Sequence, residues 1–340
     1  MNKHKFLSLG LILVAALLLT FLKVPLASSQ GVTLEVAQVS GDLPLEDPDS
    51  DMWQSATALE VPLSAQNVTK PMLLETRVQS ISVRALHNGE QIAFLVEWDD
   101  DTKDDQSIRV QDFRDAVAIQ FPRAAGQPFF CMGMQGGSVN IWHWKADWQA
   151  DIAAWQDMET LYPDMNVDQY PFAQGELPAP VDYQDVNYVP AMAAENLFAM
   201  PRLSPVEDLV AGGFGTLTAE PAEAQNVQGM GVWENNRWRV IFSRDIISQD
   251  ADDASFDSGQ VGSVAFAAWD GANGERNGMK STSQWVSLQV EGKGPAVPGD
   301  TVPEQAAGLP VTLIMSILVG GLVILLIVGA IIYFRLPDEG

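Results

Sequence analysis

One segment of the chain, residues 129–147, combines side chains that bind metals and pack against flat cofactors. It contains Met132 and Met134, a glycine-rich turn, and closely spaced tryptophans that include Trp142 and Trp144. Haem iron accepts the thioether sulfur of methionine as an axial ligand, and aromatic rings pack well against a porphyrin face. The segment therefore suits the wall of a haem pocket. Methionine and tryptophan also fill ordinary hydrophobic cores, so the segment taken alone leaves both interpretations open.

A second segment, residues 269–281, places a lysine near the end of a polar, glycine-rich stretch. Trp269 ends an apolar run that predicts a buried strand, and Lys280 stands just before the next strand-like run. Without further information, this pattern predicts a hairpin loop with an exposed lysine. The acidic run 99–105 lacks the glycine and glutamate positions of a calcium-binding EF-hand loop. We expect that run to be a solvated strand end.

The composition excludes several classes of site and partner. The single cysteine rules out an intrachain disulfide, a cysteine-rich iron–sulfur cluster and covalent attachment of a c-type haem. Only three histidines are present, which argues against a multi-histidine metal centre. The formal net charge of −25 argues against binding of nucleic acid, whose phosphates would be repelled, and favours a cationic partner.

Short β-like runs separated by turns must position these segments. Residues 81–86 and 91–98 flank an Asn88-Gly89 pair, which is a strong hairpin signal. Further runs follow at 116–121, 238–242, 264–269 and 284–290. With few helical patterns between them, these runs predict a mainly β fold, an antiparallel β-sandwich. We also expect an amphipathic helix over 145–158 and a long irregular insertion over 162–228.

Two apolar segments frame this sandwich. Lys3 and Lys5 precede an apolar run and the small residues near Ser29, which is the pattern of a secretory signal, cleaved or retained as an anchor. Near the other end, an uncharged apolar stretch is long enough to span a bilayer as one helix. The expected organisation, in residue ranges, is a signal peptide (1–29), the sandwich domain (30–291), a Pro/Gly stalk (292–308), a transmembrane helix (309–334) and a cytoplasmic tail (335–340). Arg335 places the tail inside by the positive-inside rule, so we expect a single-pass plasma-membrane protein with an extracytoplasmic, periplasmic ectodomain.

Several motifs in order along the ectodomain resemble one family. Met132-Gly133 is followed by the run VNIWHWKAD at 139–147, and the segment 269–281 has the pattern Trp-Asp-Gly followed by Asn-Gly-Met-Lys-Ser. The motif Trp-Asp-Asp-Asp-Thr at 98–102 and the stretch 231–244 also fit. Together they resemble the haem b (γ) subunit of ethylbenzene-dehydrogenase-type molybdenum enzymes. That group includes dimethylsulfide, selenate, chlorate and nitrite-oxidising complexes.

The resemblance implies one non-covalent haem b, held in a β-sandwich between an axial methionine and an axial lysine. It places these ligands at Met132 and Lys280, with Met134 as the competing methionine, and it places Trp142, Trp144 and Trp269 around the cofactor. His143 falls at a variable position of the motif, so we expect it behind the ligands or on the surface. Ser138 stands where family members often have proline, and the soluble members lack a C-terminal membrane helix.

Such a haem has no open coordination position and transfers electrons. The resemblance therefore implies a non-catalytic relay between a molybdenum catalytic subunit with its iron–sulfur subunit and a cytochrome c or another redox carrier. Two alternatives remain at this point. One is a carbohydrate-binding β-sandwich that uses its ten tryptophans as sugar platforms, and the other is a haem-free membrane anchor subunit.

Overall fold

The computed structural model describes residues 32–123, 132–166, 196–257, 259 and 261–292. All of them belong to the first of two units, residues 1–294 and 295–340. The predicted signal segment, most of the stalk, the transmembrane helix and the tail lie outside the described residues. Within the described part, no helix is long and apolar enough to cross a membrane.

The described part is mainly β, with few helices. Its strands are β1 (Thr33–Gln38), β2 (Leu59–Pro62), β3 (Ser64–Ala65), β4 (Ser80–His87), β5 (Gln91–Asp99), β6 (Ala116–Pro122), β7 (Val139–Lys145), β8 (Val206–Ala211), β9 (Thr218–Ala219), β10 (Gln228–Trp233), β11 (Arg237–Asp245), β12 (Val261–Trp269), β13 (Ser281–Thr282) and β14 (Val286–Val290). Its helices are α2 (Ala146–Ala153), α3 (Met158–Leu161) and the 3₁₀ turns η1 (Asp51–Ser55), η2 (Leu197–Ala199) and η3 (Ala222–Ala224).

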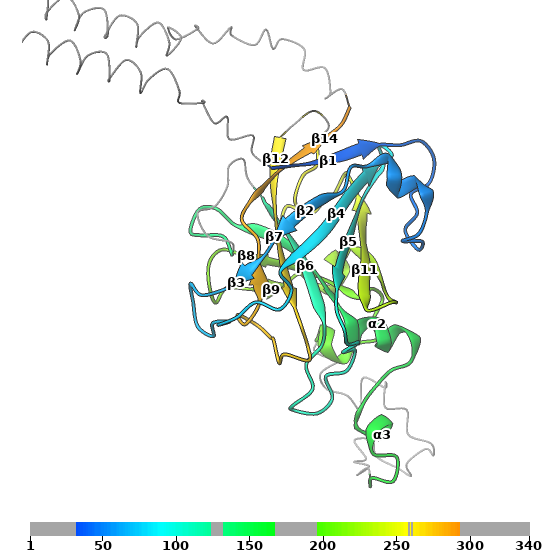
Figure 1. Ribbon diagram of the computed structural model, residues 1–340, viewed down its shortest axis with the longest axis vertical. Coiled ribbons are helices and arrows are strands. Elements are labelled where there is room, and N and C mark those ends of the chain that lie inside the picture. The colour runs from blue at the N-terminus through cyan, green and yellow to red at the C-terminus, as the bar shows by residue number, and fades with distance from the viewer. Residues whose placement is uncertain (1–31, 124–131, 167–195, 258, 260, 293–340) are drawn as a thin grey trace, which may run out of the picture. The chain divides into compact units, whose positions relative to one another are not determined.

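The strands form one continuous sheet that folds into two layers (Figure 1). Its order is β10-β11-β5-β4-β1-β14-β12-β6-β7-β8-β9. The first half of β12 pairs with β14 and its second half pairs with β6, so β12 belongs to both layers. The predicted antiparallel sheet is wrong at one place, because β1 runs parallel to both β4 and β14. The sheet is therefore mixed.

The two layers face each other across an aromatic core. Phe94 of β5 packs against Phe121 of β6 and Trp142 of β7, with ring centroids 5.6 and 5.9 Å apart. Trp144 of β7 packs on Trp238 of β11 with centroids 4.9 Å apart. All five rings are buried, and such aromatic pairs stabilise a core beyond the area they bury. The main hydrophobic core of the described part therefore lies between the two layers of a mainly β, mixed sheet.

Three predictions about local structure have different outcomes. The Asn88-Gly89 hairpin is confirmed, since β4 and β5 pair antiparallel on either side of it. The predicted helix is shorter than expected, because α2 ends at Ala153. The predicted irregular insertion is wrong in its second half. Val206–Ala211 forms β8, which pairs along its whole length with β7. Residues 167–195 lie outside the described residues.

Candidate cofactor site

The outer face of the β12-β6-β7-β8 layer is made largely of small and aliphatic side chains. Cross-strand register aligns Ala267 with Ala118, and Ala118 with His143. One step along, Gln120 pairs with Ile141 and Ile141 with Leu209. Because side chains alternate between the two faces of a strand, these residues share one face. The face they form is mostly apolar, and at its alanines it carries no bulky side chain.

A cavity of about 540 Å³ lies over this face. Its apolar lining includes Ala116, Ala118, Ile141, Leu209, Ala267 and Trp269. Its polar lining includes Lys70, Arg114, His143, Arg276 and Lys280. An apolar pocket with a few converging polar groups is the usual form of a small-molecule or cofactor site.

Lys280 and Met132 meet at this cavity. The Nζ atom of Lys280 lies 3.6 Å from the Sδ atom of Met132, and 148 positions separate them in the chain. The same Nζ lies 5.1 Å from the centre of the Trp269 ring. An amine and a thioether sulfur are thus presented together beside an aromatic wall. The prediction that this lysine is exposed is wrong, since Lys280 is half-buried and lines the cavity.

The backbone around Met132 explains why glycine follows it. Gly133 has a φ of +72°, and a Cβ atom there would lie 2.7 Å from the carbonyl oxygen of Ala211. The Gly213 N–H donates a hydrogen bond of 2.8 Å to the Met132 carbonyl, which ties this turn to the end of β8. Met134 is 43% exposed and is absent from the cavity lining. The structure therefore directs Met132, and not Met134, toward Lys280.

The loop that carries Lys280 is fixed by hydrogen bonds at both ends. The Gln66 backbone N–H donates to the Lys280 carbonyl at 2.9 Å, and the Gln66 side-chain amide donates to the Gly278 carbonyl at 2.8 Å. At the other end, the Trp269 indole N–H donates to the Asn277 carbonyl at 3.1 Å. These bonds hold the position of Lys280 without using its amine.

Asp115 joins this loop to the segment 100–115. Its carboxylate accepts hydrogen bonds from the Gly271 N–H at 2.9 Å, the Asp104 N–H at 2.8 Å and the Trp238 indole at 3.0 Å. The acidic run expected to be solvated therefore folds back onto a buried carboxylate. Asp100 in that run is buried as well. Burial is the main reason why the pKa of Asp100 is raised to about 6.

Trp142 and Trp144 lie on the opposite face of β7 from the cavity. Both are fully buried in the aromatic core, and neither lines the cavity. The Trp144 ring fills the space above Gly231 of β10, where a Cβ atom would overlap it. Of the three tryptophans expected around a cofactor, the structure therefore brings only Trp269 to the cavity.

His143 stands between these two tryptophans and so points the other way. Its ring lines the cavity and stacks on Trp269, with centroids 4.7 Å apart and an interplanar angle of 30°. Burial lowers the pKa of His143 well below its usual value, and the nearby cations Lys145, Arg114 and Lys280 act in the same direction. His143 is therefore a neutral ring in the cavity wall.

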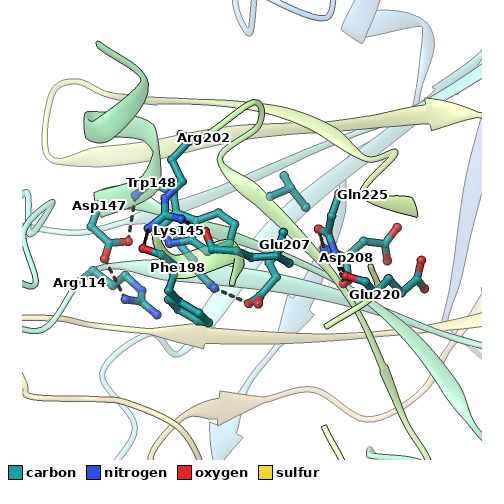
Figure 2. A network of polar contacts seen from close by, with 12 residues as sticks. Arg114, Lys145, Asp147, Trp148, Phe198, Arg202, Glu207, Asp208, Glu220 and Gln225 are labelled. Carbon is teal, nitrogen blue, oxygen red and sulfur yellow. Dashed lines mark hydrogen bonds and ion pairs between the residues drawn. The ribbon is translucent and has the colours of Figure 1, made fainter. Parts of the chain in front are cut away.

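One end of the same face carries a buried charge network that the sequence did not single out (Figure 2). Lys145 of β7 forms an ion pair with Glu207 of β8. The Trp148 ring lies 3.8 Å from the Lys145 Nζ, and the Arg202 guanidinium lies 4.2 Å from the same ring. Burial lowers the pKa of Lys145 to about 8, although the Glu207 carboxylate raises it.

The family model described as ethylbenzene dehydrogenase matches residues 50–281, which is most of the chain. The chain belongs to the ethylbenzene dehydrogenase family. The matched range contains Met132 and Trp269 and includes Lys280 one residue before its end. The part of the chain that matches the family therefore includes both segments whose side chains meet at the cavity, the one with Met132 and the one with Lys280.

Three relatives support this assignment. A Haloferax mediterranei protein provisionally named respiratory nitrate reductase heme subunit ORF7 is 26% identical, over 85% of this chain and 87% of its own length. The chlorate reductase subunit gamma of Ideonella dechloratans is 24% identical, over 71% and 78% respectively. The dimethylsulfide dehydrogenase subunit gamma of Rhodovulum sulfidophilum is 23% identical, over 75% and 78%. These family members are named as subunits of oxidoreductases.

Among solved structures, this member of the ethylbenzene dehydrogenase family has a distant likeness to a family 9 carbohydrate-binding module from Caldicellulosiruptor kristjanssonii in complex with glucose. The identity is 7%, the TM-score is 0.37, and the match covers 78% of this chain and all of the other. A likeness at this level carries no argument about function.

Proposed function

We propose that the chain is a non-catalytic electron-transfer subunit that binds one non-covalent haem b in the cavity, with Met132 and Lys280 as axial ligands. The observation that carries the proposal is the 3.6 Å approach of the Lys280 Nζ and the Met132 Sδ. Both atoms are donors that haem iron accepts, and they come from two loops that lie 148 positions apart in the chain.

The cavity lining fits a haem in two further respects. Alanine side chains at Ala116, Ala118 and Ala267 leave room for a flat macrocycle, and aliphatic neighbours suit its apolar faces. Lys70, Arg114 and Arg276 also line the cavity. Their charges would complement the carboxylates that a haem carries, although Arg114 is already paired with Asp147 at 2.8 Å.

Lysine binds iron only as the neutral amine. With an unperturbed pKa of about 10.4, removing the proton at pH 7 costs about 4.6 kcal/mol in water. Axial coordination to iron would have to offset this cost. A bound haem with two protein ligands supplies one-electron transfer and no site for substrate or oxygen.

The reaction itself would then belong to another subunit. The relatives are named as subunits of nitrate and chlorate reductases and of dimethylsulfide dehydrogenase, and the motifs resemble γ subunits of molybdenum enzymes. A molybdenum catalytic subunit with an iron–sulfur subunit is therefore the proposed partner on one side. A cytochrome c or another redox carrier is the proposed partner on the other, and the membrane anchor at 309–334 stays a prediction.

A basic carrier suits the net charge of −25. Opposite charges accelerate encounter, and salt screens this effect. The rate of electron transfer to a basic cytochrome c should therefore fall as ionic strength rises from about 10 to 300 mM. A rate that does not change with salt would reject electrostatic steering and leave the haem assignment untouched.

The sugar-binding alternative finds little support in the tryptophans. All ten lie within the described residues, and Trp155, at 40%, is the exposed one among them. A sugar platform requires an open aromatic face. The exposed Trp155 lies on the segment between α2 and α3, away from the cavity lining.

An absorption spectrum of the purified full-length protein tests the proposal. We expect sharp reduced α and Soret bands and a pyridine haemochrome of the b type, with about one haem per chain. A protein that shows no haem bands after expression with sufficient haem would overturn the proposal. Binding to immobilised polysaccharide in that case would support the sugar-binding alternative, and its absence would support a haem-free anchor.

A further inference from the structure

Three buried carboxylates gather on the face of β8 opposite the cavity. Asp208 lies in β8, Glu220 follows β9 directly, and Asp253 lies in the loop after β11. All three are buried, and one carboxylate oxygen from each lies within 4.8 Å of the others. Figure 2 shows Asp208 and Glu220 with their carboxylates side by side.

Two of these carboxylates have an oxygen that no donor among the described residues satisfies. Asp208 Oδ1 accepts a hydrogen bond of 2.6 Å from the Asn140 amide, which also reaches Glu220 Oε1 at 3.4 Å. Asp208 Oδ2 and Glu220 Oε2 accept no hydrogen bond from any described residue. Buried polar atoms without a partner are rare and costly in folded proteins. A ligand that binds both oxygens would remove this cost.

The local charge points to a cation. Among the described residues, Arg244 is the cation in contact, with its Nη1 2.6 Å from Asp253 Oδ1. When a cation is bound and all three carboxylates are ionised, the cluster and the Arg244 guanidinium carry a net charge of −2, which a divalent ion would neutralise.

We propose that Asp208, Glu220 and Asp253 bind a divalent calcium ion. Calcium takes oxygen ligands at about 2.3–2.6 Å, so two of its ligands lie at most about 5 Å apart. The three carboxylate oxygens meet this limit. Magnesium is less suited, because it demands near-ideal octahedral geometry and keeps several waters.

The surroundings favour entry of a cation and give it a structural role. The half-buried Asp250 and Asp252 lie in the same loop as Asp253, so negative charge extends from the cluster toward the surface. The ion would tie the loop after β11 to β8. Leu209, the next residue of β8, lines the cavity on the other face. The ion therefore steadies the strand that forms part of the cavity floor.

Metal analysis of the full-length protein provides the first test. The protein is stripped with EGTA, supplied with CaCl₂ or MgCl₂, desalted, and assayed for metal and for its thermal midpoint. We expect calcium to be retained and to raise the midpoint, because a ligand that binds only the folded state stabilises it. Magnesium should have a smaller effect. Absence of bound calcium at millimolar supply would overturn the proposal and indicate shared protons among the carboxylates.

Variants locate the ion. Glu220→Gln and Asp208→Asn keep the size of each side chain and remove its charge. Each should lose one bound calcium per chain relative to wild type, together with the calcium-induced rise in the thermal midpoint. Glu223→Gln, an exposed residue three positions away, makes the same charge change and should keep both. If Asp208→Asn does not fold, the Glu220→Gln variant alone tests the site. A Glu220→Gln protein that still binds as much calcium as wild type would contradict the proposed calcium site.

Discussion

Lys145 and Glu207 form an ion pair inside the protein, on neighbouring strands of the layer that carries the cavity. Both side chains are almost wholly removed from solvent, and Trp148 covers the ammonium group. Desolvation makes such a pair a weak source of net stability, but it makes the loss of either partner costly.

Glu207→Gln should therefore destabilise the protein by about 3–5 kcal/mol, because it leaves the Lys145 ammonium buried without its counter-ion. The double variant Lys145→Met with Glu207→Leu should recover much of that loss, since it removes both charges. Chemical denaturation of the three proteins measures these differences. A single variant that costs less than about 1 kcal/mol would show that the pair is solvated and weak.

Gly271 permits the contact between the Lys280 loop and the segment before β6. A Cβ atom at Gly271 would overlap the carbonyl oxygen of Phe113, which cannot move without shifting the Asp115 hydrogen bonds. Gly271→Ala should cost about 1–3 kcal/mol of folding free energy and lower the cofactor content. Gly212→Ala is the matched control, because nothing lies within 4 Å of its added Cβ. Equal effects of the two substitutions in urea unfolding would contradict this account.

His87 links stability to pH. Burial lowers the pKa of His87 from 6.5, although Glu291 acts in the opposite direction. Below about pH 6.5 the unfolded chain takes up a proton at His87 that the folded chain does not, so stability falls as pH falls. His87→Gln should flatten this dependence between about pH 6.5 and 5. Unfolding free energies at several pH values test it, and parallel curves for the two proteins would refute it.

A substitution at Trp142 distinguishes a residue of the hydrophobic core from a residue that contacts the cofactor. Because its ring packs between Phe94, Phe121 and Phe256, Trp142→Phe should cost about 1–3 kcal/mol. It should leave the visible spectrum of the bound cofactor unchanged. A shifted Soret band in Trp142→Phe would place this ring against the cofactor after all. Trp269→Phe is the companion variant and should shift that band, since Trp269 lines the cavity.

Local sequence patterns predicted some of the fold and missed its long-range parts. The Asn88-Gly89 turn predicted the β4–β5 hairpin because turn type and register are set by adjacent residues. The parallel pairing of β1 with β4 and β14 joins segments far apart in the chain, and no local signal encodes it. Strand β8 was missed because Glu207 and Asp208 look like surface residues. Both are buried, one against Lys145 and the other beside Asn140.

The candidate site, like the fold, was predicted only in part. Resemblance named Met132 and Lys280, and the structure brings their donor atoms together. The resemblance also placed Trp142 and Trp144 beside the cofactor, but in the structure these two rings face the hydrophobic core. In a strand, a shift of one residue moves a side chain to the other face. The sequence of β7 alternates correctly, but it does not reveal which face is the cavity. His143 was undervalued for that reason.

Spectroscopy of ligand variants tests the central claim most directly. Full-length Lys280→Ala and Met132→Ala are compared with Lys103→Ala, which removes a surface lysine paired with Asp105, and with Met134→Ala. Visible and electron paramagnetic resonance spectra report the coordination of haem iron. We predict that each of the first two variants loses the six-coordinate low-spin signature and that both controls keep it. An intact low-spin spectrum in Lys280→Ala or in Met132→Ala would contradict the axial pair.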